Sequence, residues 1–404
     1  MAEDHNQSKG IVATIKLVFR KIKQDGVGVT LMRYKASLYR YVKDMRYKLH
    51  NLSKTNFELA IYHFQHGNVS DAILRFRMLR KFFRSQYSKY IVSEYYLGRC
   101  YMEELKYDKA KEHLANYLNS DNTEKLEEAD FCLKLIEGKT SDIKIVPYSI
   151  ISHNFDIVST KYNAIFFNDR ESPPQKVIYN LLHKTVQRSS KPFANNILDL
   201  GCGTGIIGKL CRNAKIASNI VGIDISEGML NQAASLQIDK EPVYNYTFNT
   251  NADLYLQSTK INNKYDIVIL SNLITYSANF TNILEKLDNF TTDQAIIGIT
   301  FRTIDDRSKE WEFMTRIEQF WYNPEYIITT AEMLGWHIVE KKGISFIGGE
   351  KGMAVVISKV PLLLESDDLQ VQSQAEGAAK EVKFKDDMNL NTEGYTEAGK
   401  EKKE

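Results

Sequence analysis

The stretch ILDLGCGTG, residues 197–205, decides the fold of the chain. An apolar segment runs into three glycines at alternate positions, and a helical segment follows from about Ile206. Glycine adopts positive φ angles without strain and lets the main chain approach a ligand closely. The order of strand, glycine-rich turn and helix predicts a turn at the carboxyl end of a strand in an open α/β sheet, where such sheets bind ligands.

Downstream of this turn, apolar segments alternate with helical ones as far as residue 359. This alternation predicts a parallel sheet covered by helices on both faces. The last two apolar segments are joined by a short glycine-rich connection, so they should form an antiparallel hairpin at the edge of the sheet. The seven expected strands are 196–200, 220–224, 244–248, 266–271, 295–300, 336–340 and 353–358.

The glycine turn fits two kinds of nucleoside ligand. Residues 203–208, GTGIIG, form a literal GxGxxG, and Asp224 follows about 20 residues later. These two features by themselves fit a binding site for a nicotinamide dinucleotide. Asp199 separates the two, because a fingerprint that began at Gly203 would leave this carboxylate alone inside a buried strand. In the pattern DxGxGxG, Asp199 instead lies at the strand tip, where it can orient a ligand's ammonium group directly or through water. A pyrophosphate has no such group.

These segments resemble the class I S-adenosylmethionine-dependent methyltransferases, especially the ubiquinone-biosynthesis-like "type 11" group. The resemblance covers residues 150–360 and implies a Rossmann-like seven-stranded domain with S-adenosyl-L-methionine as cofactor. Together with helical repeats upstream, the chain is similar to bacterial methyltransferases that carry tetratricopeptide (TPR) repeats. The matching segments are LDLGCGTG (198–205), VGIDISEGML (221–230), NADL (251–254) and KYDIVILSNLITY (264–276).

The resemblance implies a role for each cofactor-binding residue. The glycine turn and Asp199 would hold the methionine part, and Asp224 the ribose. Asp253 would accept a hydrogen bond from the adenine amino group, although an ordinary loop role fits this residue too. Asn272 follows the fourth strand, where many relatives carry Asp. Ile225 and Met229 would line the adenine pocket, and Leu254 would pack on the adenine ring. The full expected set of cofactor-binding residues is Asp199, Gly201, Gly203, Gly205, Asp224, Ile225, Met229, Asp253, Leu254 and Asn272.

The sequence assigns no catalytic residue. Methyl transfer from a sulfonium depends mainly on holding the nucleophile near the methyl group, and a base is needed only when the nucleophile must lose a proton. The ionisable candidates near the expected cleft are His153, Tyr162, Tyr276 and His337, and a structural role accounts for each as well. No metal is expected, because the four cysteines lack metal-ligand spacing and suggest reduced thiols.

Length and composition predict a soluble protein with more than one folded unit. The chain has 404 residues, and this length exceeds what one hydrophobic core normally organises. Its composition, 43% hydrophobic and 26% charged residues, is that of an ordinary soluble globular protein. No apolar run reaches the roughly 20 residues of a membrane span, and the N-terminus lacks a signal-peptide pattern. We therefore expect a cytoplasmic protein.

Charge and periodicity divide the chain into four parts. Residues 9–54 contain twelve Lys/Arg against two acidic residues, and residues 361–404 contain eleven Asp/Glu against six Lys. Helical periodicity within the first stretch predicts a basic amphipathic arm, which can pack on the next segment or contact an anionic membrane surface. The expected parts are an arm at 1–50, TPR-like helices at 51–140, a class I methyltransferase domain at 148–360 and a disordered acidic tail at 361–404.

A repeat predicts the TPR-like part. The spacing of Asn56, Ala60 and Ala72 recurs at Glu94, Gly98 and Ala110, with small residues where paired helices would cross closely. Such helices typically recruit a protein partner.

An aromatic stretch after the fifth strand has two interpretations. Residues 311–322 contain five aromatic side chains. They can form a wall against an apolar or planar methyl acceptor, or a helix packed on the sheet.

The favoured function is a methyltransferase for a small-molecule or lipid-like acceptor, with the TPR-like helices binding a protein. One alternative is an RNA or protein methyltransferase that docks through the basic arm. The other is a TPR adaptor whose methyltransferase fold binds cofactor without catalysis.

Overall fold

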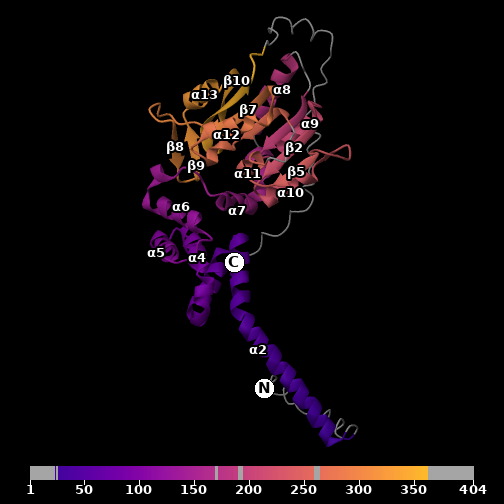
Figure 1. Ribbon diagram of the computed structural model, residues 1–404, viewed down its shortest axis with the longest axis vertical. Helices are drawn as coiled ribbons and strands as arrows, with labels where there is room; N and C mark the ends of the chain where they lie inside the picture. The colour runs from indigo at the N-terminus through magenta and orange to yellow at the C-terminus, as the bar shows by residue number, and fades with distance from the viewer. Residues whose placement is uncertain (1–22, 24–25, 169–171, 190–193, 259–263, 363–404) are drawn as a thin grey trace, which may run out of the picture.

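A computed structural model describes residues 23, 26–168, 172–189, 194–258 and 264–362. Helices at one end of the molecule lead into an α/β domain at the other (Figure 1). The first part of the expected basic arm, residues 1–22, and nearly all of the acidic tail lie outside the described residues.

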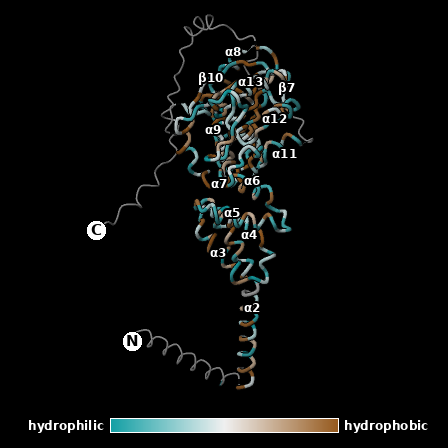
Figure 2. Tube along the Cα trace, turned by 90° about the vertical axis from the view of Figure 1, so that its left-hand side faces the viewer, coloured by the Kyte–Doolittle hydropathy of each residue, from teal (hydrophilic) through white to brown (hydrophobic). Residues whose placement is uncertain are grey.

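The basic arm continues without a break into the helical region. Helix α2 (Val27–Gln65) is a single helix of 39 residues, so the boundary predicted between residues 50 and 51 falls inside it. The reason is local, because neither glycine nor proline occurs between Thr30 and Gln65. Nearly all described side chains before residue 50 are exposed, whereas burial begins at Ser53. The free part of α2 projects from the body of the molecule (Figure 2).

The helical region consists of packed helix pairs, α2 with α3 and α4 with α5. Ala60 and Ala72 are fully buried in the first pair, and Ala110 in the second. A Cβ atom at Gly98 would lie 2.6 Å from the Leu114 side chain, so the α4–α5 crossing requires glycine. The helices are α3 (Val69–Phe82), the 3₁₀ helix η1 (Arg84–Tyr90), α4 (Val92–Glu103), α5 (Tyr107–Leu118) and α6 (Leu126–Glu137).

A connecting segment leads from α6 into the α/β domain. It contains η2 (Thr140–Asp142), α7 (Tyr148–Val158), η3 (Ser159–Lys161), η4 (Ala164–Asn168) and α8 (Pro174–Arg188). Proline occupies the first helical position of α8, where its fixed φ angle suits the start of a helix.

The α/β domain contains the seven-stranded sheet that the sequence predicts. Its order is β10-β11-β7-β6-β1-β2-β5, and the five strands from β7 to β5 run parallel. β11 is antiparallel to both β7 and β10, which confirms the expected terminal hairpin. The strands are β1 (Ala194–Leu200), β2 (Ala217–Asp224), β5 (Tyr246–Asn249), β6 (Tyr265–Ser271), β7 (Thr291–Arg302), β10 (His337–Ser345) and β11 (Lys351–Ser358).

Helices cover both faces of this sheet. Side chains of α12 and α13 pack in one core cluster with Leu198, while those of α8 and α9 pack in a second with Ile197. Adjacent strand residues thus point to opposite faces, as the period of a strand requires. The remaining elements are α9 (Ile206–Asn213), α10 (Glu227–Ser235), the short strands β3 (Gln237–Ile238) and β4 (Glu241–Pro242), α11 (Ala252–Leu256), η5 (Ile274–Tyr276), α12 (Phe280–Asp288), α13 (Pro324–Met333) and η6 (Ile347–Gly349).

The aromatic stretch after β7 is neither a helix nor part of the main sheet. It forms an antiparallel hairpin of β8 (Trp311–Met314) and β9 (Gln319–Tyr322). The expected helix is wrong, because aromatic side chains alternate in and out of this ribbon, with Phe313 and Phe320 buried. The Phe313 ring meets Phe131 of α6 edge-on at 6.1 Å. The hairpin therefore joins the helical region to the α/β domain.

No helix in the described part of the chain is both long and apolar enough to span a membrane. This finding includes α2, whose length exceeds a membrane span but whose sequence is strongly charged.

Candidate functional site

The glycine turn after β1 has the backbone that its sequence predicts. Gly201, Gly203 and Gly205 have φ angles of 75°, 55° and 83°. Residues other than glycine rarely adopt such positive φ angles. The N–H groups of Gly201 and Cys202 donate to the Ile223 carbonyl at 2.8 and 2.9 Å. The turn is therefore fixed to the end of β2 before helix α9 begins.

Asp224 ends β2 beside this turn. One carboxylate oxygen accepts from the Gly203 N–H at 2.8 Å and the other from the Ser226 N–H at 2.9 Å. Burial raises the pKa of Asp224 to about 6, although the backbone hydrogen bonds oppose this shift. A carboxylate has about four lone-pair sites, so two acceptor positions are left for a ligand.

Asp199 lies behind the turn. Its side chain is 1% exposed, and its Oδ2 accepts from the Tyr244 hydroxyl at 2.7 Å. Its Oδ1 is buried with no hydrogen-bond partner among the described residues. Burial, together with the nearby Asp224 charge, raises the pKa of Asp199 to about 7, and the hydrogen bond from Tyr244 opposes the rise.

Three glycines make room for the Tyr244 ring. A Cβ atom would lie 2.3 Å from this ring at Gly208, 2.7 Å at Gly222 and 2.9 Å at Gly205. Gly208, the last glycine of the literal GxGxxG, therefore admits a tyrosine side chain. The packing of Tyr244 therefore accounts for glycine at position 208 without a bound dinucleotide. Sequence reasoning places Tyr244 at the start of a strand and misses its contact with Asp199.

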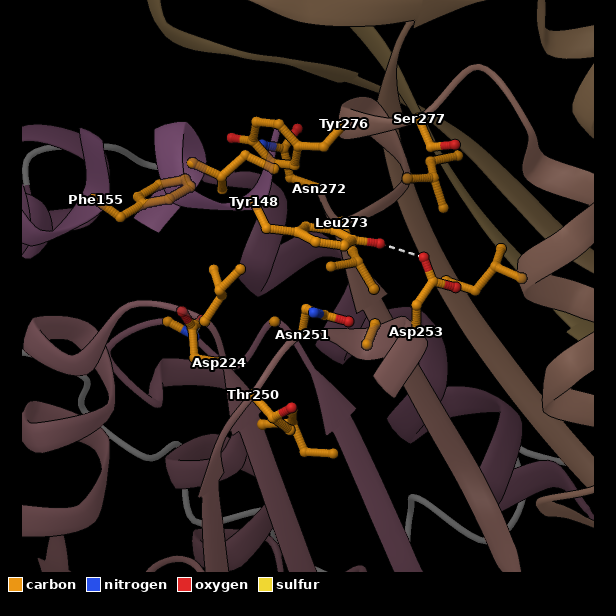
Figure 3. A pocket seen from close by; sticks show the side chains of 18 of the residues that line it. Tyr148, Phe155, Asp224, Thr250, Asn251, Asp253, Asn272, Leu273, Tyr276 and Ser277 are labelled. Atoms are coloured by element: carbon orange, nitrogen blue, oxygen red, sulfur yellow. Dashed lines mark hydrogen bonds between the residues drawn. The ribbon is translucent and has the colours of Figure 1, made fainter. Parts of the chain in front are cut away.

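A pocket opens where β1, β2 and β6 end, beneath helix α7. Phe155 and Tyr276 lie on one side of it and Asp224 and Thr250 on the other (Figure 3). It brings together seven of the ten residues expected to bind the cofactor, namely Gly201, Gly203, Asp224, Ile225, Met229, Asp253 and Asn272.

Three expected residues lie outside the pocket lining. Asp199 and Gly205 are covered by the turn and by Tyr244. Leu254 is 61% exposed, so it does not pack against the pocket as expected. The reason is that Asn251 caps α11 by accepting from the Leu254 N–H at 2.8 Å, and Leu254 then falls on the outer side of that short helix.

Asp253 reaches the pocket with both carboxylate oxygens already engaged. Oδ1 accepts from Lys286 at 2.5 Å, and Oδ2 accepts from the Tyr148 hydroxyl (Figure 3). Although burial raises the pKa of Asp253, these two hydrogen bonds hold it below the ordinary value. The residue is therefore a fixed carboxylate at the edge of the pocket.

Asn272 adopts a φ of 57° just after β6, a conformation that asparagine tolerates better than most residues. Its N–H donates to the Thr300 hydroxyl at 2.9 Å, and its Oδ1 accepts from Arg302 at 3.1 Å. The side chain is thus oriented by β7, and Asn272 lines the pocket.

Of the four ionisable residues expected near the cleft, two line the pocket and two lie outside its lining. Tyr162 and Tyr276 line the pocket and meet Phe155 edge-on. Burial raises the pKa of Tyr162 to about 12, so it remains a hydroxyl at neutral pH. His153 instead stacks on Phe64 at 4.5 Å, and burial and the nearby Arg99 lower its pKa to about 4. His337 is exposed on the edge strand β10.

Helix α7 supplies residues that sequence reasoning missed. Tyr148 and Phe155 line the pocket, and Asp156 ties α7 to the start of α10. The Asp156 Oδ1 accepts from the Ser226 hydroxyl at 2.6 Å and from the Gly228 N–H at 2.9 Å. No motif marks these residues, because their role comes from a segment folding back over the turn.

Residues 198–297 match the family described as a methyltransferase domain. Together with the strand order and the terminal hairpin, this match shows that the chain carries a class I methyltransferase domain.

Two curated relatives are malonyl-[acyl-carrier protein] O-methyltransferases. The one from Bacillus cereus is 23% identical over 151 residues, 37% of this chain and 54% of the relative. The one from Acetivibrio thermocellus is 31% identical over 134 residues, 33% of this chain and 44% of the relative. The chain thus spans about half the length of the curated relatives it matches.

Solved structures similar to this chain include two methyltransferases. The magnesium protoporphyrin IX methyltransferase of Synechocystis PCC 6803, with bound S-adenosylmethionine, is 15% identical with a TM-score of 0.40, covering 53% of this chain and 97% of that one. The 1,6-didemethyltoxoflavin-N1-methyltransferase of Burkholderia thailandensis is 10% identical with a TM-score of 0.44, covering 55% and 93%.

Proposed function

We propose that the chain is an S-adenosylmethionine-dependent methyltransferase. The observation that carries the proposal is the convergence, in one pocket, of the positive-φ glycine turn and the Asp224 carboxylate within a methyltransferase domain. In a dinucleotide site the third glycine lets the helix pack closely on the strands, whereas Gly208 here makes room for the Tyr244 ring.

The pocket fits the parts of S-adenosylmethionine. Nothing lies within 4 Å of a Cβ atom built on Gly203, so the turn has space for the methionine part of the ligand. The unpartnered Oδ1 of Asp199 supplies negative charge behind this turn for the ligand's ammonium group. The free acceptor positions of Asp224 suit the ribose hydroxyls, and Ile225 and Met229 suit the adenine.

The residues of the pocket would act by positioning. Bound S-adenosylmethionine supplies a methyl group on a sulfonium, which a nucleophile attacks in line. Holding the two in contact can lower the barrier by roughly 7–11 kcal/mol at best. Tyr162 and Tyr276, both protonated at neutral pH, would donate hydrogen bonds and exclude water, and we assign neither as a base.

The acceptor we propose is a small or lipid-like molecule. The lining of the pocket includes the apolar and aromatic side chains of Phe155, Tyr276, Ile145 and Ile283. The curated relatives act, by name, on a carrier-bound malonyl group. They match about a third of this chain, so they support methyl transfer without naming the acceptor.

The test is transfer of an isotope-labelled methyl group from the cofactor into metabolite and lipid extracts. The full chain should label a discrete product, and an Asp224→Ala form should not. Cofactor binding without any labelled product would favour the adaptor function, in which the fold binds cofactor but does not catalyse. A labelled RNA or protein in whole lysate would favour the alternative acceptors.

For the helical region we propose TPR-like packing and recruitment of a protein partner. The support is the repeated pair geometry, with small buried residues at the crossings. The experiment is affinity capture with the full chain and with an Ala110→Leu form. A partner retained equally by both forms would contradict a role for this packing.

For the arm, residues 9–54, we propose contact with an anionic membrane surface beside the cytoplasm. In its described part, Leu31, Met32 and Tyr39 are 60–73% exposed among basic residues, as expected of an interfacial helix. Co-sedimentation with phosphatidylglycerol vesicles at low salt should fall when residues 1–50 are deleted. Binding unchanged by this deletion would contradict the proposal.

A further inference from the structure

A second cavity, a shallow groove on the helical region, carries an excess of positive charge. It is lined by α3, η1 and the facing sides of α4 and α5, and its charged rim consists of Arg77, Arg80, Lys81 and Arg84. No lining residue is acidic. The sequence between residues 75 and 89 holds six Lys/Arg and no Asp/Glu, so the charge is concentrated on one short segment.

Most of this charge has no counter-ion among the side chains of the described residues. Arg80 lies 3.9 Å from Glu94. Among the side chains that the structure describes, no carboxylate lies within ion-pairing distance of Arg77, Lys81 or Arg84. Three cations at one groove repel each other unless an anion from outside joins them.

His113 lines the floor of the groove, and the buried Glu94 lies behind it. Glu94 is 2% exposed and accepts from the Tyr87 hydroxyl at 2.5 Å and from Nδ1 of His113 at 2.6 Å. Although burial raises the pKa of Glu94, these hydrogen bonds hold it below the ordinary value. Glu94 is therefore a carboxylate, and Nδ1 of His113 carries the hydrogen between them.

This pairing leaves the other ring nitrogen of His113 for the groove. His113 is 7% exposed, lines the groove and stacks on Tyr101 at 5.3 Å, so its ring cannot turn freely. Its Nε2 has no hydrogen-bond partner among the described residues. A carboxylate that holds one imidazole nitrogen fixes the orientation of the ring and therefore of the other nitrogen, as it does for histidines that bind metals.

We infer that this groove binds a phosphate group, free or as part of a phosphate ester. Guanidinium groups match phosphate oxygens in geometry and charge, and a buried imidazole adds a directional contact at the floor. The unbalanced charge of three cations exceeds what a single carboxylate neutralises, which favours phosphate over a simple carboxylic acid. The inference concerns the helical region alone and does not depend on the proposed methyl transfer.

The experiment titrates the full chain with pyrophosphate by calorimetry at low ionic strength. The test variant is Arg77→Gln with Arg84→Gln, because both side chains are exposed and the fold does not depend on them. The control is Lys111→Gln with Lys134→Gln, which removes the same charge outside the groove. We expect wild-type binding, a loss of about tenfold or more in the arginine variant and unchanged affinity in the control. No wild-type binding, or equal losses in both variants, would overturn the inference.

Two further readouts sharpen the result. Pyrophosphate should shift the ¹⁵N resonance of His113 Nε2, and an unmoved resonance would contradict contact at the floor. Phosphatidylglycerol vesicles identify the source of the phosphate. If co-sedimentation with the vesicles falls in the arginine variant, the ligand is a lipid headgroup. If co-sedimentation is unchanged in this variant, the ligand is a soluble phosphate ester. Cofactor affinity should be the same in all variants, so failure here is distinguishable from failure of the methyltransferase proposal.

Discussion

At the scale of single residues, the site depends on a carboxylate that is costly to bury. Asp199 has one oxygen held by Tyr244 and one without a partner among the described residues. Its pKa of about 7 lies above the ordinary value, so the folded protein binds its proton more tightly than the unfolded chain does. Its contribution therefore becomes unfavourable as the pH rises from about 4 to about 7.

The first prediction is that Asp199→Asn stabilises the cofactor-free protein at high pH. The difference in unfolding free energy from wild type should grow between pH 4 and 8, by on the order of 2–4 kcal/mol, while cofactor affinity falls. Chemical denaturation across this pH range measures it. A constant difference at all pH values would show that Asp199 does not titrate in the folded protein.

The second prediction concerns the space around Tyr244. Gly208→Ala places a methyl group 2.3 Å from the tyrosine ring, so it should displace the ring and cost about 1–3 kcal/mol of stability. Gly343→Ala is the matched control, since nothing lies within 4 Å of its Cβ position. Thermal unfolding compares the two, and equal midpoints would contradict the described packing.

At the scale of elements, α7 closes the site over the end of β2. Asp156 joins it to α10 through Ser226 and Gly228. The third prediction is that Asp156→Ala weakens cofactor binding about tenfold by loosening α7, with a smaller effect on the unfolding temperature. Asp142→Ala, at an exposed position before α7, should leave the affinity unchanged. Equal affinity of both variants would mean that α7 takes no part in closing the pocket.

The elements also show what the sequence could predict. The seven strands and the terminal hairpin follow from apolar runs and a glycine-rich connection, which are local signals. The β8–β9 hairpin was missed because Phe313 packs on Phe131 and the Trp311 ring contacts Lys144, and both partners lie far away in sequence. The boundary expected between residues 50 and 51 falls inside α2, because the change in burial at residue 53 needs no change in the backbone.

The site likewise contains residues that the sequence predicts and residues that only the fold brings together. Asp224 and the glycine turn are encoded by spacing alone, and the structure places them together. Tyr244 lies 45 residues from Asp199, and three glycines that fit around its ring become meaningful only in three dimensions. Leu254 was misplaced because one asparagine cap fixes where α11 begins.

At the scale of the whole molecule, the helical region and the α/β domain share a hydrophobic core. Tyr117 and Phe131 belong to the same buried cluster as Leu198 and Val268. The fourth prediction is that the two parts unfold together, in one calorimetric transition. Deleting residues 1–50 should leave this transition nearly unchanged, because the described part of the arm is exposed. Two separate transitions would contradict the shared core.

The most direct test of the central claim is calorimetric titration of the full chain with S-adenosylmethionine. The pocket geometry predicts one binding site per chain, with affinity lost when Asp224→Ala removes the carboxylate beside the glycine turn and retained when the exposed Asp142→Ala is made instead. An absence of binding by the wild-type chain at millimolar cofactor would contradict the claim, as would binding indifferent to Asp224.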